Sequence, residues 1–159
     1  MKKYIVLILI SIFACFLCGC VKKKKELNDL QIIKKRDYII VGVKTDSPPF
    51  GYYDKNDKLV GFDIDIAYAI AERIFGEKSY ANVRFVPVNT QNRISKLNSK
   101  EVDILVATMS INSKRKLVMD FSAPYFVANQ KLLVRKTSGA INLQYFNKSG
   151  RLAVVMGTT

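Results

Sequence analysis

The stretch Tyr38-Ile39-Ile40-Val41-Gly42-Val43 decides the fold, because it is a short apolar run rich in β-branched residues. A run without a polar face is typical of a parallel strand that is buried on both sides. The strand leads directly into Lys44-Thr45-Asp46-Ser47-Pro48-Pro49, where two prolines disfavour a helix and predict a stiff loop. The sequence therefore predicts a buried strand whose carboxyl end opens into a rigid polar loop.

Helical and strand patterns alternate after this loop. Ile66, Ile70 and Ile74 recur at every fourth position, which predicts a helix capped by Asp63 and ended by Gly76. The other predicted elements are a hairpin turn at 54–58, a strand at 83–88, a helix at 91–98, a strand at 102–107, a short basic helix at 113–119, an extended stretch at 126–135 and a strand at 151–155. This alternation predicts an α/β fold with a mostly parallel sheet.

Three polar loops, at 44–50, 90–93 and 108–115, lie at the carboxyl ends of predicted strands. In open α/β sheets, ligands bind beyond the carboxyl ends of the strands. We therefore expect these loops to meet and to form the binding site of the protein.

The composition excludes several kinds of catalytic site. The chain has 26 Lys and Arg residues against 13 Asp and Glu, a net charge of +13, and no His. All three Cys residues lie in the first twenty positions, and Cys15 and Cys18 fall inside an apolar run. A zinc site and a Cys/His or Ser/His nucleophile are therefore excluded. We expect no enzymatic activity, no metal and no cofactor.

The first twenty residues have the pattern of an export signal. Met1-Lys2-Lys3 gives a positive start, and an apolar run from 4 to 17 follows that is short for a membrane span. The run ends in Leu17-Cys18-Gly19-Cys20, which resembles the bacterial lipobox. We expect a signal peptide at 1–19 and lipidation of Cys20, which would anchor the chain outside the cytoplasm to a bacterial membrane. The alternative is an uncleaved N-terminal anchor helix.

Much of the positive charge lies beside this predicted anchor, at 22–25 and 34–36. Basic residues next to a lipid anchor strengthen its attachment to anionic headgroups. An exported chain has little use for nucleic acid, so we expect the lipid bilayer and not nucleic acid as a partner. The alternative is a lysine-rich tether that is simply solvated.

Three groups of residues, taken in order, resemble one known family. They are 41–50 continuing through 61–66, then 89–94, and finally 109–116 with 120–125. Together they resemble the bacterial extracellular solute-binding protein family 3, which has the type 2 periplasmic-binding fold. The resemblance implies a substrate-binding lipoprotein that captures a polar amino acid and delivers it to an ABC permease.

The resemblance also implies a domain organisation. It places the signal peptide at 1–19, the lipidated Cys and a basic tether at 20–37, the first lobe at 38–126, a hinge crossing at 127–136 and the start of a second lobe at 137–159. Members of the family bind their ligand between two lobes, and in this sequence the second lobe is only begun. A monomer of this chain is therefore not expected to bind by closure of two lobes.

Several site residues follow from the resemblance alone. Arg115 occupies the position of the residue that grips the α-carboxylate, a bidentate match that Lys cannot copy. Ser110 resembles a hydroxyl residue that assists it, and the backbone of Thr108 resembles the acceptor for the ammonium group. Thr158 and Thr159 would begin the ligand loop of the second lobe, at a helix N-terminus. Without the resemblance, Arg115 is equally well a solvated charge on a basic helix.

Further residues would select the ligand side chain. Relatives that take glutamate or aspartate have a basic residue at the position of Lys44 and an Arg at that of Arg93, after a segment like the one that starts at Thr90. Two cations in one cleft suit a second carboxylate. Lys44 turned to solvent and Arg93 paired with an acidic neighbour are the alternatives. Phe50 is a candidate for the cleft wall and Asp46 for an ammonium partner.

Two other readings of the whole chain remain open. The same fold serves as a sensor module in signalling or cell-wall proteins, and a non-functional fragment of a binding protein would share these motifs. Ligand titration separates an active binding protein from a fragment.

Overall fold

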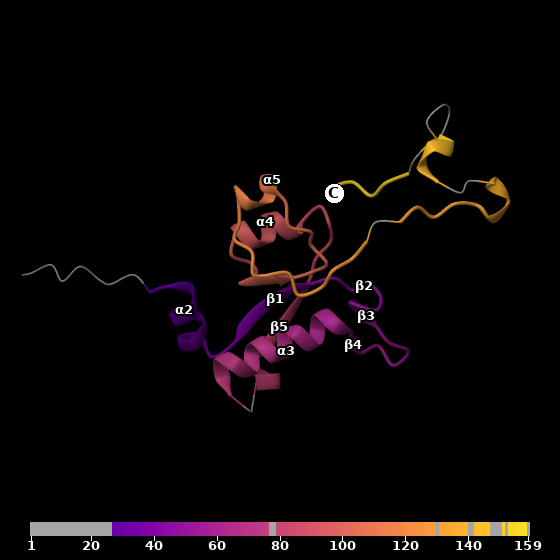
Figure 1. Ribbon diagram of the computed structural model, residues 1–159. Helices are drawn as coiled ribbons and strands as arrows, with labels where there is room; N and C mark the ends of the chain where they lie inside the picture. Colours follow the sequence, from indigo (N-terminus) through magenta and orange to yellow (C-terminus); the bar gives the residue numbers. More distant parts are fainter. Residues whose placement is uncertain are drawn as a thin grey trace, which may run out of the picture. The chain divides into compact units, whose positions relative to one another are not determined.

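The computed structural model describes residues 27–76, 79–129, 131–139, 142–146, 151 and 153–158 (Figure 1). The chain divides into two compact units, residues 1–32 and 33–159, and the sheets and the site belong to the second unit. The predicted signal peptide and Cys20 lie outside the described residues. Within those residues, no helix combines the length and apolar character needed to cross a bilayer.

A parallel sheet of three strands forms the centre of the second unit. Strand β1 (Ile39–Val43) is the middle strand. It pairs in parallel with β5 (Val83–Pro87) on one side and with β6 (Ile104–Val106) on the other. Val41 and Val43 of β1 are completely buried. The predicted α/β fold with a parallel sheet is therefore confirmed, and the apolar run at 38–43 contains its middle strand.

Helix α3 (Phe62–Phe75) supplies much of the hydrophobic core, through Ile64, Ala67 and Ala71. Figure 1 shows α3 on one side of β1 and β5 and α4 (Arg93–Asn98) on the other, and both helices contact β1. This arrangement buries both faces of the central strand, as its uninterrupted apolar sequence requires.

The capping role predicted for Asp63 is wrong. The N-cap of α3 is Gly61, at φ 125°, where an added Cβ would clash with the carbonyl oxygen of Phe50. Asp63 instead lies inside the first turn with its carboxylate buried among tertiary partners. The predicted end of the helix is confirmed, because Gly76 adopts φ 85° and its N–H donates to the carbonyl of Glu72.

A small antiparallel sheet follows the loop that contains the two prolines. Its strands are β2 (Asp46–Ser47), β3 (Gly51–Tyr53) and β4 (Leu59–Val60). The predicted hairpin turn is confirmed, and Asp54 closes it by accepting from the backbone N–H groups of Asn56 and Lys58. The stiff loop after β1 thus contains a short strand of its own.

The remaining elements are short. They are the 3-10 helices η1 (Ser79–Asn82), η2 (Lys136–Ser138) and η3 (Leu143–Phe146) and the helix α5 (Ser113–Lys116). Helix α4 begins two residues later than predicted, because Asn89 Oδ1 accepts from the N–H groups of Gln91 and Asn92 and holds a turn there. The strand predicted at 151–155 is not formed by the described residues of that segment, for which no paired strand is described.

Part of the predicted tether is helical. Helix α2 (Asp29–Arg36) buries the side chain of Ile33 in the hydrophobic core. Its last residue, Arg36, forms an ion pair with Asp103. Arg36 also donates to the carbonyl of Tyr38. These contacts were not predicted from the sequence, because a Lys- and Arg-rich stretch with few apolar residues has the pattern of a solvated linker.

We expect Ile33→Ala to lower the free energy of unfolding by about 2–5 kcal/mol, the usual cost of removing a buried isoleucine side chain. The neighbouring Ile32 is 39% exposed and Ile33 only 6%, so Ile32→Ala is a matched control that should change stability by less than about 0.5 kcal/mol. Urea unfolding of both variants measures the difference. Equal effects would contradict the packing of Ile33 into the core.

Candidate functional site

The loops at the carboxyl ends of the parallel strands form an open pocket of about 480 Å³. Six of the residues expected at the site line it: Lys44, Asp46, Thr90, Arg93, Thr108 and Thr158. Residues from distant parts of the sequence meet here because parallel strands present their carboxyl ends at one edge of the sheet.

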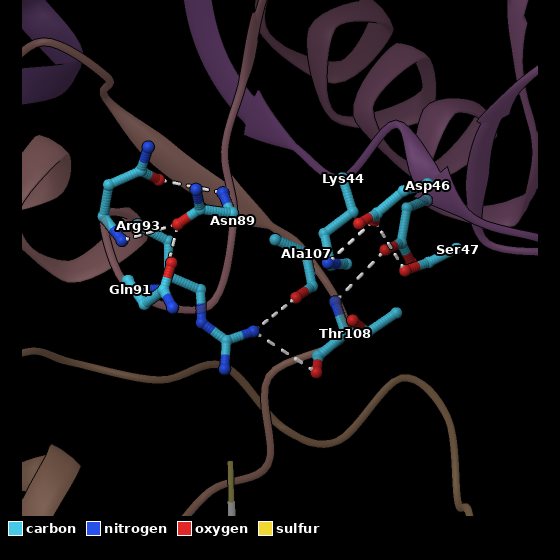
Figure 2. Close-up of polar contacts among 10 residues, drawn as sticks. Lys44, Asp46, Ser47, Asn89, Gln91, Arg93, Ala107 and Thr108 are labelled. Carbon is cyan, nitrogen blue, oxygen red and sulfur yellow. Dashed lines mark hydrogen bonds and ion pairs between the residues drawn. The ribbon is translucent and has the colours of Figure 1, made fainter. Parts of the chain in front are cut away.

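Lys44 and Asp46 pair with each other across the start of the first loop (Figure 2). Lys44 Nζ lies 2.8 Å from Asp46 Oδ1, and the lysine side chain is 12% exposed while that of Asp46 is 70% exposed. The hydrogen bond from Lys44 holds the pKa of the Asp46 carboxyl below its ordinary value. The pair therefore presents a cation and an exposed carboxylate side by side.

Arg93 is buried at the start of α4, with only 3% of its surface exposed. Its Nη1 donates to the carbonyl oxygens of Ala107 at 2.8 Å and of Thr108 at 3.5 Å (Figure 2). Its Nε is the buried side-chain nitrogen that has no hydrogen-bond partner in the described part of the chain. Burial, and after it the positive charge of Arg115, lowers the pKa of the Arg93 guanidinium.

Arg115 is the second buried guanidinium, with 8% of its surface exposed. Nη1 donates to the carbonyl of Ser110 at 2.7 Å, and Nη2 donates to that of Gly157 at 2.9 Å. The three ion pairs found among the described residues include neither Arg115 nor Arg93. Both cations are therefore held by backbone carbonyl groups, with no carboxylate opposite them in the described structure.

The helix that carries Arg115 is capped. Asn112 precedes α5 in an extended conformation, and its Oδ1 accepts from the backbone N–H of Arg115 at 2.9 Å. Sequence reasoning missed Asn112, although an asparagine directly before a helical segment is a common N-cap signal.

Thr108 adopts an uncommon backbone conformation directly after β6, with φ 47°. Its N–H donates to Asp63 Oδ2 at 3.2 Å, and the Tyr125 hydroxyl donates to Asp63 Oδ1 at 3.1 Å. A non-glycine residue in such a conformation costs about 1–3 kcal/mol. A hydrogen bond to a charged group contributes about 1.5–3 kcal/mol, so the contact with Asp63 is large enough to offset the strain.

The Asp63 carboxylate is completely buried, and burial raises its pKa above the ordinary value while the two hydrogen bonds oppose the rise. Burial and the charge of Asp63 also raise the pKa of Tyr125. No sequence signal identified this pair, because Asp63 and Tyr125 are far apart in the chain and only the tertiary fold brings them together.

Of the other four expected residues, two line a second pocket, one lies outside the described residues, and Arg115 is not among the lining residues of either pocket. Phe50, Thr108 and Ser110 line a neighbouring pocket of about 420 Å³, where the Phe50 ring packs edge-on against Phe126 with the ring centres 4.9 Å apart. Thr108 lines both pockets. Thr159 lies outside the described residues. No group of three or more metal-ligating side chains occurs within the described ranges.

Comparison with known proteins identifies one family. Residues 39–154 match the family described as bacterial extracellular solute-binding proteins, family 3. The chain is 39% identical to the ABC transporter glutamine-binding protein GlnH of Bacillus subtilis (strain 168), an alignment that covers 100% of this chain and 61% of that protein. The chain thus spans less than two thirds of this curated relative's length. Other relatives, at 29–33% identity, are binding proteins for L-cystine, arginine, and glutamate and aspartate.

Solved structures similar to this chain are also amino acid-binding proteins. The ancestral amino acid-binding protein AncCDT-1, a precursor of cyclohexadienyl dehydratase, matches with a TM-score of 0.64 and 38% identity, covering 70% of this chain and 47% of that one. The arginine-bound form of domain 1 of the T. maritima arginine-binding protein, as a Phe57Trp mutant, matches with a TM-score of 0.56 and 38% identity over 61% of this chain and 71% of that one.

The buried carboxylate at Asp63 leads to a pH-dependent prediction. Because its folded pKa is raised, its favourable contribution to stability is complete below the unfolded pKa of about 3.9 and is lost as the pH rises through the folded value. Asp63→Asn removes this titration. We expect the variant to gain stability relative to the unmodified chain as the pH rises from 3 to 7, measured by urea unfolding at several pH values. A variant that instead loses stability relative to the unmodified chain as the pH rises would show that the pKa of Asp63 is lowered.

Proposed function

The chain belongs to the bacterial extracellular solute-binding proteins, family 3, and on that premise we propose that it captures a polar amino acid outside the cytoplasm for delivery to an ABC permease. The capture is by binding and involves no catalysis. Lipidation of Cys20, which would keep the protein at the membrane, belongs to the same proposal.

The observation that carries this proposal is the pair of buried guanidinium groups. The positive charge of Arg115 contributes to lowering the pKa of Arg93, and the ion pairs among the described residues include neither of them. A buried cation without an anionic partner is costly, so the site favours an anion from outside the chain. The carboxylate of an amino acid is such an anion.

We assign the α-carboxylate of the ligand to Arg115. Its guanidinium has a planar fork that suits a carboxylate, and one arm now donates to the carbonyl of Gly157. The ammonium group of the ligand would be accepted by the carbonyl of Thr108, at the end of β6. The arginine-bound form of domain 1 from the T. maritima relative supports the idea that the first domain of such a protein supplies contacts to an amino acid.

Charge balance favours glutamate or aspartate as the ligand. Lys44 and Arg93 are the cationic residues that line the pocket, and Asp46 is the acidic one. Arg115 does not line it but is a further cation near Arg93. With its two carboxylates and one ammonium group an acidic amino acid is a net anion, so it offsets part of the positive charge, whereas an amino acid with a neutral side chain is a zwitterion and offsets none of it. In this assignment the second carboxylate lies against Lys44 and Arg93.

Glutamine is the second candidate, and the pairing of Lys44 with Asp46 favours it. A carboxamide needs one donor and one acceptor, which the ammonium of Lys44 and the exposed carboxylate of Asp46 supply together. The relative at 39% identity is also a glutamine-binding protein. The two candidates differ in the effect expected of the Asp46 carboxylate.

Isothermal titration of the full chain with glutamate, aspartate and glutamine tests the proposal. We expect Arg115→Lys to weaken the preferred ligand at least tenfold, about 1.4 kcal/mol, because a single ammonium cannot make the bidentate contact. Lys114→Ala changes an exposed neighbour on the same helix and should leave affinity unchanged. An unmodified chain that binds none of the three would refute the proposal, as would full affinity in the Arg115 variant.

Substitution of the pair at the loop discriminates between the two ligands. If the ligand is acidic, Lys44→Met should weaken glutamate at least tenfold and glutamine less than threefold, while Asp46→Asn should strengthen glutamate. If the ligand is glutamine, Asp46→Asn should weaken it. Lys55→Met, at an exposed position in the hairpin turn, is the control for loss of one positive charge. An equal loss of both ligands in Lys44→Met would contradict a role in selection.

A further inference from the structure

We propose that Asp63 is a positioning residue of the ligand site, whose buried carboxylate holds Thr108 in the left-handed conformation that directs the strand-end carbonyl groups and the following loop into the site. This inference rests on the proposed function, because it concerns the same site. It assigns a task to a residue that touches no ligand in the proposal.

The backbone of Thr108 is the reason for the proposal. Of the four non-glycine residues with positive φ in the described ranges, Asp37, Asp57, Lys100 and Thr108, only Thr108 is β-branched. The left-handed region is least favourable for such a residue, and a conformation of this kind persists only where its surroundings enforce it. Thr108 also follows the last buried residues of the β6 segment, Val106 and Ala107, and lines both pockets.

Two buried ionisable groups hold this turn. Asp63 Oδ2 accepts the N–H of Thr108. Arg93 Nη1 donates to the carbonyls of Ala107 and Thr108 (Figure 2). The carboxylate and the guanidinium come from different helices, α3 and α4. The conformation of Thr108 is therefore fixed by tertiary contacts and not by the preference of its own side chain.

Asp63 has no other structural task in the described part of the chain. It does not cap α3, and none of the described ion pairs includes it. Its second oxygen accepts the Tyr125 hydroxyl, so both oxygens of the buried group are satisfied. Because Tyr125 lies two residues before the segment predicted as the hinge crossing, one carboxylate connects α3, the ligand loop and the end of the predicted first lobe.

The test compares four forms of the full chain by isothermal titration with the amino acid that the unmodified chain binds best. Asp63→Ala removes the acceptor, and we expect at least a tenfold loss of affinity. Asp63→Asn keeps an oxygen for the N–H of Thr108, while its amide can donate to the Tyr125 hydroxyl oxygen, so affinity should stay within threefold. Asp65→Ala, an exposed aspartate on the same helix, should have no effect. Unchanged affinity in Asp63→Ala would overturn the proposal.

A double-mutant cycle separates positioning from a general loss of stability. Glycine adopts positive φ without a penalty, so in a Thr108→Gly background the change Asp63→Ala should weaken binding less than threefold relative to that background. A tenfold loss in both backgrounds would contradict the inference. Asp63→Leu, which fills a similar volume without an acceptor, replaces the Ala variant if that variant does not fold.

A measurement without ligand distinguishes this inference from the proposed function. Hydrogen exchange of the Thr108 amide, followed by NMR, should be slow in the unmodified chain and in Asp63→Asn but fast in Asp63→Ala. A chain that binds no amino acid yet shows this pattern would refute the proposed function and leave Asp63 as the hold on Thr108. Equal exchange rates in all three forms would refute the hold itself.

Discussion

Strand β1 pairs in parallel with β5 on one side and with β6 on the other, and this pairing brings together the segments that carry Lys44, Arg93 and Thr108. Parallel strands run in one direction, so the segments that follow Val43, Pro87 and Val106 leave the sheet at the same edge. Lys44 begins the first of these segments, the second leads to Arg93, and the third contains Thr108. The pocket that these residues line is therefore a consequence of burying one apolar strand on both faces.

Burial at this edge has an electrostatic consequence. Arg93 and Arg115 lie where carbonyl groups of the strand ends and loops accept their N–H groups, which satisfies much of the hydrogen bonding but supplies only partial negative charge. The unpaired Nε of Arg93 and the lowering of its pKa by burial and by the positive charge of Arg115 express the same imbalance. The acidic groups nearby do not correct it, because Asp46 pairs with Lys44 and Asp63 binds Thr108 and Tyr125.

Local patterns in the sequence predicted those parts of the fold that depend on local physics. The apolar run at β1 and the stop at Gly76 report burial and backbone preference directly. The recurrence of Ile66, Ile70 and Ile74 predicted the helix, but these side chains are only partly buried, and the buried residues of α3 include Ile64, Ala67 and Ala71. Asp63 shows the limit of such rules, since an aspartate at the start of a helix has the pattern of a cap although tertiary partners bind its carboxylate. Ile33 and Arg36 were missed for a related reason, because their partners lie far away in the sequence and a basic composition outweighed one buried isoleucine.

The positions of the site residues followed from strand order, but their pairings could not. Sequence alone treated Lys44 and Asp46 as separate ligand contacts, whereas the loop conformation brings them within 2.8 Å of each other. The strain at Thr108 was equally invisible, since φ is set there by a carboxylate on α3 and a guanidinium on α4. Both findings mean that the donors and acceptors of the site are held in place by the protein before a ligand arrives. A ligand that binds such a site does not have to order these groups itself, so more of its interaction energy is available as affinity.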